Sequence, residues 1–202
     1  MHVINKKEEI IIKFEGAKRE ALSSFGNNSI LIEQYLQNPR HIEVQILADN
    51  YGNIHTLSDR DCSIQRRHQK VIEEAPATNI SQEIRKEMAF QAKQVAKNIS
   101  YSGAGTIEFL LENNKFYFME MNTRLQVEHP VTELILGIDL VELQIKVANN
   151  EEVKSLPNLI KGHAIEARVY AENPEKDFQP APGIILEFNS PKKDYLRVDT
   201  GY

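Results

Sequence analysis

The chain has 202 residues, a formal net charge of −5 and a composition that is 41% hydrophobic and 26% charged. These values are ordinary for a globular protein with a substantial core, and the acidic balance argues against nucleic acid as a partner. Apolar runs reach only a few residues, so no membrane-spanning segment is expected. Cys62 is the single cysteine and cannot form an internal disulfide. We therefore expect a reducing compartment, either the cytoplasm or, in a eukaryote, the mitochondrial matrix.

The first part of the chain is expected to hold one helix and several strands. Residues 17–25 have helical propensity, and Gly26 follows as a left-handed stop. Strands are expected at 29–36, an apolar run interrupted by a glutamate, and at 41–48, where polar and apolar residues alternate as in a half-buried strand. A turn near 50–53 should then reverse the chain into another strand, at 54–57.

The middle of the chain contains the strongest helical pattern. Ser81 is a candidate N-cap, and apolar residues follow it on one helix face at Ile84, Met88, Ala92, Val95, Ala96 and Ile99. A hairpin is expected next, with arms at 106–111 and 116–121, and then a second helix near 139–148. The periodicity lapses at 155–158, and a β-rich region begins near residue 162. Helices mixed with hairpins predict an antiparallel α+β fold.

Glu108 and Glu120 are the most informative residues, because each lies in one arm of the hairpin among large apolar residues. Carboxylates on paired strands repel each other unless a cation lies between them. With the amide oxygen of Asn122 they form an all-oxygen set, the kind that Mg²⁺ or Mn²⁺ prefers. A two-residue turn at 113–114 would point the two glutamates to opposite sides of the sheet, so the metal hypothesis requires a longer loop or a bulge. The alternative is that both glutamates simply face solvent.

Two further clusters are suited to binding anions, and one glutamate is suited to binding a nucleotide base. After the second hairpin arm, Arg124 could stabilise an oxyanion and Glu128 could take a proton from a weak acid, although a surface ion pair is the alternative. Glu33, near the end of an apolar run, could accept a hydrogen bond from an adenine amino group. The other cluster is a basic stretch that suits phosphate or bicarbonate: Arg60, Arg66, Arg67, His68 and Lys70. Its alternatives are a solvated loop or RNA contact, and the lack of aromatic residues in the stretch does not support the latter.

A series of motifs, in order and at a consistent spacing, resembles biotin carboxylase, a member of the ATP-grasp superfamily. They lie at residues 39–45, 60–63, 65–70, 73–77, 103–106 and 120–124, continuing through 131–133. The series is specific, and the similarity runs over nearly the whole chain. Residues 123–126 and 166–174 look most like the α subunit of acyl-CoA carboxylases, such as methylcrotonoyl-CoA or propionyl-CoA carboxylase.

The resemblance implies an ATP-dependent carbon–nitrogen ligase. ATP would phosphorylate bicarbonate to carboxyphosphate, and the carboxyl group would pass to a ureido nitrogen of biotin on a carrier domain. The implied cofactors are ATP and Mg²⁺ or Mn²⁺, with biotin as a carrier-bound substrate. The implied partners are a biotin carboxyl carrier domain and a carboxyltransferase subunit, in an oligomer, with no nucleic acid and no membrane.

The resemblance also implies roles for individual residues. The adenine hinge would be formed by Glu33, Gln34, Tyr35 and Leu36, with His41 and His68 near the nucleotide and Gln65 near the ribose. The metal ions would be held by Glu108, Glu120 and Asn122, and bicarbonate would be surrounded by Lys70, Arg124, Gln126 and Val127. Glu128 would be the base that deprotonates bicarbonate, Arg124 would stabilise the biotin enolate, and Arg168 would contact carboxyphosphate and biotin.

The implied domain organisation is part of an ATP-grasp lid at 1–35, the catalytic subdomain at 36–155 and the start of a β-rich C-terminal domain at 156–202. Gln34 departs from the family, which usually has lysine there. The N-terminal domain and glycine-rich phosphate loop would precede residue 1, so we expect a fragment with little or no turnover. Two alternatives remain: another ATP-grasp ligase, such as one forming carbamoyl phosphate, and a non-catalytic nucleotide-binding module.

Overall fold

The computed structural model describes residues 2–157 and 159–201, which divide into two compact units. The first unit ends at Glu166, and the second begins at Ala167. The boundary expected at 155–158 includes Asn158, which lies outside the described residues, and the named subdomains remain predictions. In the described ranges, no helix has the length and apolar character that crossing a bilayer would require.

The first unit begins with helical structure. A 3₁₀ helix, η1 (Lys7–Glu9), leads into α1 (Ile10–Phe25), which starts earlier than the sequence predicted. Gly26 ends α1 with a φ of 68°, so the predicted left-handed stop is confirmed. The strand predicted at 29–36 is wrong. That segment has no regular structure, because its apolar side chains, such as Leu31, stay exposed and none of the described strands pairs with it.

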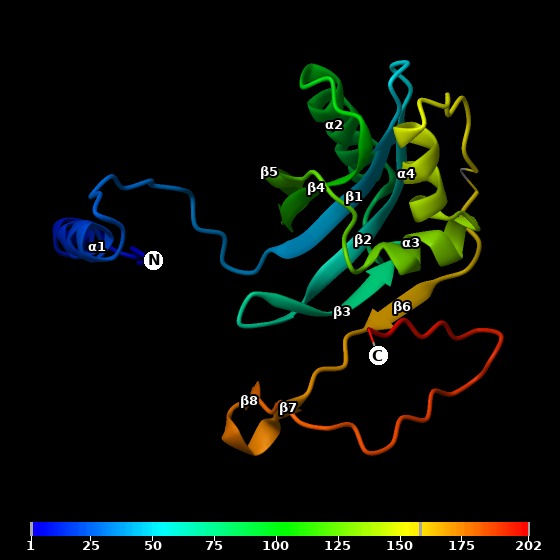
Figure 1. The fold of residues 1–202 in the computed structure, drawn as a ribbon. Coiled ribbons are helices and arrows are strands. Elements are labelled where there is room, and N and C mark those ends of the chain that lie inside the picture. Colours follow the sequence, from blue (N-terminus) through cyan, green and yellow to red (C-terminus); the bar gives the residue numbers. More distant parts are fainter. Residues whose placement is uncertain (1, 158, 202) are drawn as a thin grey trace. The chain divides into compact units, whose positions relative to one another are not determined.

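The rest of the first unit is built on a six-stranded sheet with the order β5-β4-β1-β2-β3-β6 (Figure 1). Its strands are β1 (Arg40–Ala48), β2 (Ile54–Arg66), β3 (Gln69–Ala75), β4 (Gly103–Glu112), β5 (Lys115–Asn122) and β6 (Ala164–Ala167). The β1–β2, β1–β4, β2–β3 and β4–β5 ladders are antiparallel, which confirms the predicted fold class. Strand β2 is far longer than expected, so the basic stretch at 60–70 lies in the β2–β3 hairpin rather than in a solvated loop.

Helices cover both faces of this sheet (Figure 1). On one face lies α2 (Gln82–Asn98), whose predicted cap is confirmed, because the Ser81 side chain accepts a hydrogen bond from a backbone N–H of the first turn. On the other face lie α3 (His129–Leu136), which the sequence did not predict, and α4 (Leu140–Ala148), which it did. The segment before α3 is therefore held between a strand and a helix.

The side chains of β1 alternate between two different environments. Ile42, Val44 and Ile46 are buried in a core with residues of α2. On the opposite face the strand presents His41, Glu43 and Gln45, and the last two are 0% exposed. This polar face is the surface on which the candidate site is built.

The β4–β5 hairpin places Glu108 and Glu120 on the same side of the sheet. The turn consists of Asn113 and Asn114 alone, both with positive φ (51° and 61°), as a left-handed two-residue turn requires. Glu108 nevertheless pairs with Glu120, because the register shifts just after Glu108. The condition set by the sequence is met by a bulge rather than by a longer loop.

The second unit contains little regular structure. Strands β7 (Glu172–Asn173) and β8 (Gln179–Pro180) pair antiparallel around the 3₁₀ helix η2 (Pro174–Lys176). From 181 to 201 the chain forms neither helix nor strand. The expected β-rich region is therefore represented only by short strands.

Candidate functional site

The polar face of the sheet holds a group of buried charges. Glu43 and Arg60 are 0% exposed and Glu108 is 2% exposed, although strand glutamates and arginines ordinarily face solvent. Buried charges persist only when they are paired and hydrogen-bonded. We call the group formed by Glu43, Arg60, Lys70, Glu108 and Glu128 the charged cluster.

Lys70, on β3, joins three carboxylates of this cluster. Its Nζ donates to Glu43 Oε2 at 2.6 Å, to Glu128 Oε1 at 2.7 Å and to Glu108 Oε1 at 2.9 Å. Burial alone would lower the pKa of Lys70, but the surrounding carboxylates, Glu43 foremost, raise it. The ammonium group therefore stays charged and fixes side chains from β1, β4 and the segment before α3 around one point.

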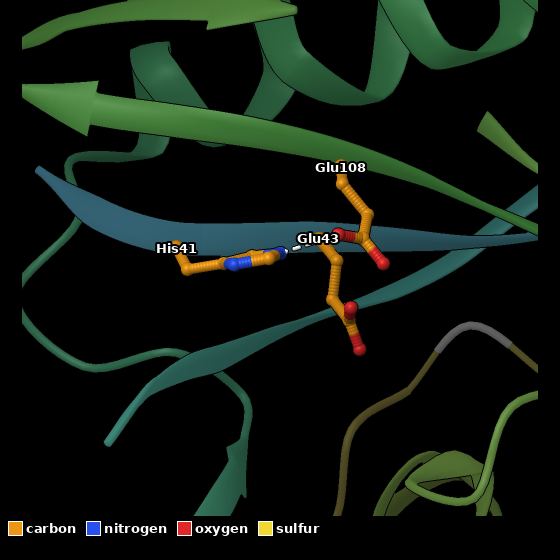
Figure 2. A group of neighbouring side chains, drawn as sticks. All are labelled: His41, Glu43 and Glu108. Atoms are coloured by element: carbon orange, nitrogen blue, oxygen red, sulfur yellow. Dashed lines mark hydrogen bonds and ion pairs between the residues drawn. The ribbon is translucent and has the colours of Figure 1, made fainter. Parts of the chain in front are cut away.

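Glu108 accepts hydrogen bonds at both of its oxygens. Its Oε1 accepts from Lys70, from Gln126 Nε2 at 2.7 Å and from Asn122 Nδ2 at 2.9 Å, and its Oε2 lies 2.6 Å from His41 Nε2. Burial opposes ionisation, but the His41 hydrogen bond and the Lys70 charge outweigh it and lower the pKa of Glu108 to about 2. Figure 2 shows the His41 ring and the Glu108 carboxylate pointing toward each other, with the Glu43 side chain next to them.

His41 is oriented by Gln65. The Gln65 amide nitrogen donates to the Cys62 carbonyl at 2.8 Å, which fixes the orientation of the amide. The same nitrogen lies 3.0 Å from His41 Nδ1, which must therefore accept. The proton of a neutral His41 then resides on Nε2 and is donated to Glu108. Burial raises the pKa of the Cys62 thiol, so its role as a small buried side chain fits better than reactivity.

Glu120 and Asn122 lie at the open edge of this group, on β5. Asn122 Nδ2 bridges Glu108 Oε1 at 2.9 Å and Glu120 Oε1 at 3.3 Å, while its Oδ1 accepts from Arg124 Nη2 at 3.2 Å. Glu120 is exposed, so its side chain has room to rotate toward another partner. Rotation of the Asn122 amide would turn its oxygen toward the two carboxylates. The three side chains therefore fit a hard divalent cation.

The remaining predicted residues divide into two groups. Gln126 and Glu128 are buried at the charged cluster, at 5% and 2% exposure, and Arg124 adjoins Asn122. The other predicted residues of the first unit do not lie at the charged cluster. Within the described residues, no hydrogen bond joins 33–36 to the polar face, Val127 is 60% exposed, and His68 lies in the exposed β2–β3 turn with a φ of 64°. Arg168 belongs to the second unit, and its role stays a prediction.

Sequence reasoning missed two members of the site and misjudged a third. The alternation predicts Glu43 and Gln45 only as the polar side of a half-buried strand, yet helices cover both faces of the sheet and both side chains are buried. Arg60 was grouped with a basic patch, but it is 0% exposed and bonds to Glu43 Oε1 at 2.5 Å. The available signal was the alternation of 41–45, in which every second residue carries a polar side chain.

The fold and the site define an α+β domain of the ATP-grasp class, with an antiparallel sheet, packed helices and an acidic group at a sheet edge. Residues 1–156 match the family described as carbamoyl-phosphate synthase L chain, ATP binding domain. The chain belongs to this family.

Relatives and solved structures agree with this assignment. The chain is 52% identical over 205 residues to methylcrotonoyl-CoA carboxylase subunit alpha, mitochondrial, of Glycine max, which covers 100% of this chain and 28% of that protein. A biotin carboxylase–β,γ-ATP complex from Campylobacter jejuni has a TM-score of 0.85 and 45% identity, covering 96% of this chain and 44% of the other.

A third comparison is the biotin carboxylase domain dimer of Hydrogenobacter thermophilus 2-oxoglutarate carboxylase, in complex with MgADP, ADP and bicarbonate. Its TM-score is 0.84 at 42% identity, over 95% of this chain and 43% of the other. The chain thus spans less than half the length of each of these three proteins.

Proposed function

We propose that this chain is the metal- and bicarbonate-binding part of a biotin carboxylase. In this function ATP phosphorylates bicarbonate, and the carboxyl group of carboxyphosphate passes to biotin. The observation that carries the proposal is the pairing of Glu108 with Glu120 on one side of the sheet, next to Lys70 and Glu128. Two carboxylates that can hold a metal ion, Glu108 and Glu120, thereby lie next to Lys70 and Glu128, which can bind a small anion.

The charge of the site supports a requirement for a divalent cation. Glu43, Glu108 and Glu128 contribute three negative charges against the two positive charges of Arg60 and Lys70. The phosphates of ATP would be repelled by the excess carboxylate. A bound Mg²⁺ or Mn²⁺ would supply the positive charge that neutralises them.

Three side chains have the chemistry for the bicarbonate step. Lys70 supplies a charged donor for an anion, and Glu128 is the carboxylate that takes the bicarbonate proton. Both are already hydrogen-bonded to each other at 2.7 Å, so the base is held in place before substrate arrives. Arg124 lies at the exposed edge, where its guanidinium would stabilise the biotin enolate.

The remaining roles follow the family pattern. Glu33, Gln34, Tyr35 and Leu36 are proposed for the adenine, and His41, Gln65 and His68 for the rest of the nucleoside. Gln126 and Val127 are proposed for bicarbonate, and Arg168 for carboxyphosphate. The proposed partners are a biotin carboxyl carrier domain and a carboxyltransferase subunit, in an oligomer. The proposed compartment is the cytoplasm, or the matrix in a eukaryote.

Calorimetry tests the metal site directly. ATP is titrated into the chain with Mn²⁺ present and with Mn²⁺ chelated, for the wild type and for Glu120→Gln. Because Glu120 is exposed, its replacement should leave the fold intact and weaken Mn²⁺-dependent ATP binding at least about tenfold. Glu87→Gln, an exposed glutamate on α2, is the matched control. Equal affinities for the wild type and Glu120→Gln would remove the proposed site.

Activity separates the carboxylase from other ATP-grasp ligases. The assay uses the full-length parent protein, because little or no turnover is expected of this chain alone. If the parent is a biotin carboxylase, it should hydrolyse ATP in a bicarbonate-dependent manner, with stimulation by free biotin. Hydrolysis that is indifferent to biotin would instead favour a ligase of the carbamoyl phosphate type.

A further inference from the structure

Arg60, on β2, has every N–H of its guanidinium bonded within the protein. Nε donates to Glu43 Oε1 at 2.5 Å, Nη1 to Gln45 Oε1 at 2.7 Å and to Thr132 Oγ1 at 2.9 Å, and Nη2 to Thr106 Oγ1 and Gln126 Oε1, both at 3.2 Å. A guanidinium has five N–H donors, and all five are used. The residue is 0% exposed, so no substrate can touch it.

Two of these partners are also part of the site, and each is bonded to Arg60 through only one of its ends. The amide oxygen of Gln126 accepts from Arg60, and its amide nitrogen donates to Glu108 Oε1 at 2.7 Å. Glu43 accepts from Arg60 at Oε1 and from Lys70 at Oε2, the latter at 2.6 Å. The rigid fork of Arg60 therefore holds the Gln126 amide with its nitrogen toward Glu108, and it holds the Glu43 carboxylate in the orientation that reaches Lys70.

The Gln126 amide shows why this matters. Its two ends are nearly identical in shape, so packing alone does not choose between them. If the amide were reversed, its oxygen would face the carboxylate of Glu108, and its nitrogen would face the guanidinium of Arg60. The donating guanidinium of Arg60 and the accepting carboxylate of Glu108 together exclude that arrangement.

We propose that Arg60 is a positioning residue of this site. It fixes the polarity of Gln126 and the orientation of Glu43, and through them it sets the placement of Glu108 and Lys70 without contacting any ligand. The proposal rests on the proposed function for its consequence in nucleotide binding. The side-chain geometry that it describes exists in the chain alone.

The first test needs no ligand. In the wild type, the side-chain amide protons of Gln126 should exchange slowly with solvent in NMR spectra, since the side chain is buried and its nitrogen donates to Glu108. Arg60→Lys keeps the charge but replaces a planar five-donor group with a three-donor ammonium, so this protection should be lost. Thr132→Val removes another acceptor of Arg60, one whose side chain makes no other hydrogen bond among the described residues, and it should keep the Gln126 protection. Unchanged Gln126 protection in Arg60→Lys would overturn the proposal.

The second test measures Mn²⁺-dependent ATP affinity. Loss of groups that orient metal ligands typically weakens binding about 10- to 100-fold, so Arg60→Lys should weaken it by at least about tenfold. Adding Arg60→Lys to Gln126→Leu should cost little beyond Gln126→Leu alone, because the two residues act through one another. A purely structural role predicts that Thr132→Val and Arg60→Lys shift affinity only in step with their loss of thermal stability.

The two proposals fail in different ways. If Glu120→Gln binds Mn²⁺ and ATP as the wild type does, the proposed function fails whatever Arg60 does. If Glu120→Gln weakens binding while Arg60→Lys retains it, the metal site stands and the positioning role of Arg60 is wrong. Should Arg60→Lys fail to fold, Gln126→Leu paired with Thr132→Val still decides: equal losses of affinity in both would overturn the proposal.

Discussion

Replacing Glu108 with glutamine should destabilise the first unit, and the loss should shrink on acidification. The carboxylate accepts from four side chains, Lys70, Gln126, Asn122 and His41, at distances of 2.6 to 2.9 Å. An amide has only one acceptor oxygen, and its NH₂ would face a donor. The substitution therefore removes a charge and leaves at least one buried donor without a partner.

The lowered pKa of Glu108 gives the size of the effect. Its pKa falls from an ordinary 4.5 to about 2. A difference of about 2.5 pKa units, at 1.36 kcal/mol each, corresponds to about 3 kcal/mol of folding free energy at neutral pH. Because the folded pKa is the lower one, this stability is present above the unfolded pKa and disappears as pH falls through the folded value. At a pH of about 3 roughly 1.4 kcal/mol should remain.

Urea denaturation of the wild type and Glu108→Gln across this pH range is the assay. The difference between the two proteins isolates Glu108 from other acidic groups. Glu120→Gln changes the exposed member of the same cross-strand pair and should cost under about 1 kcal/mol at any of these pH values. A loss below about 1 kcal/mol for Glu108→Gln at neutral pH, or one that does not diminish in acid, would refute the reasoning.

Three further substitutions, with Gly16→Ala as a control, test the scaffold by thermal denaturation. Gly105→Ala should destabilise by about 1–3 kcal/mol, because a Cβ there would lie 2.9 Å from the Tyr101 ring, whereas Gly16→Ala, with open space around it, should be neutral or stabilising. Asp49→Ala should lower the midpoint by removing the acceptor of hydrogen bonds that hold the β1–β2 turn and the backbone of Val153, and an unchanged midpoint would contradict this. Asn114→Gly should raise the midpoint slightly, because the φ of 61° favours glycine, and a lower midpoint would count against the turn assignment.

Much of the fold could be predicted from local signals. The Ser81 cap, the apolar face of α2 and the stop at Gly26 each depend on a few neighbouring residues. The strand expected at 29–36 failed for the opposite reason. A strand requires a partner to bond with, and the apolar composition of a segment does not reveal whether one exists.

The candidate site was predictable where its residues form a pattern along the chain. The pairing of Glu108 and Glu120 was posed correctly as a question of register, but only the structure shows the bulge that settles it. The role of Arg60 was not predictable, because its partners come from four separate segments of the chain. Residues that are far apart in the sequence meet at Arg60 only once the sheet and α3 have assembled.

The alternation along β1 also protects this chain against misfolding. If the strand slipped by one position against its neighbours, His41, Glu43 and Gln45 would enter the hydrocarbon interior under α2, and three branched aliphatic groups would displace them from the ionic side. Both halves of that exchange are unfavourable, so the mistaken alignment carries a double penalty. The polar residues that β1 contributes to the site therefore also specify the register in which the strand pairs.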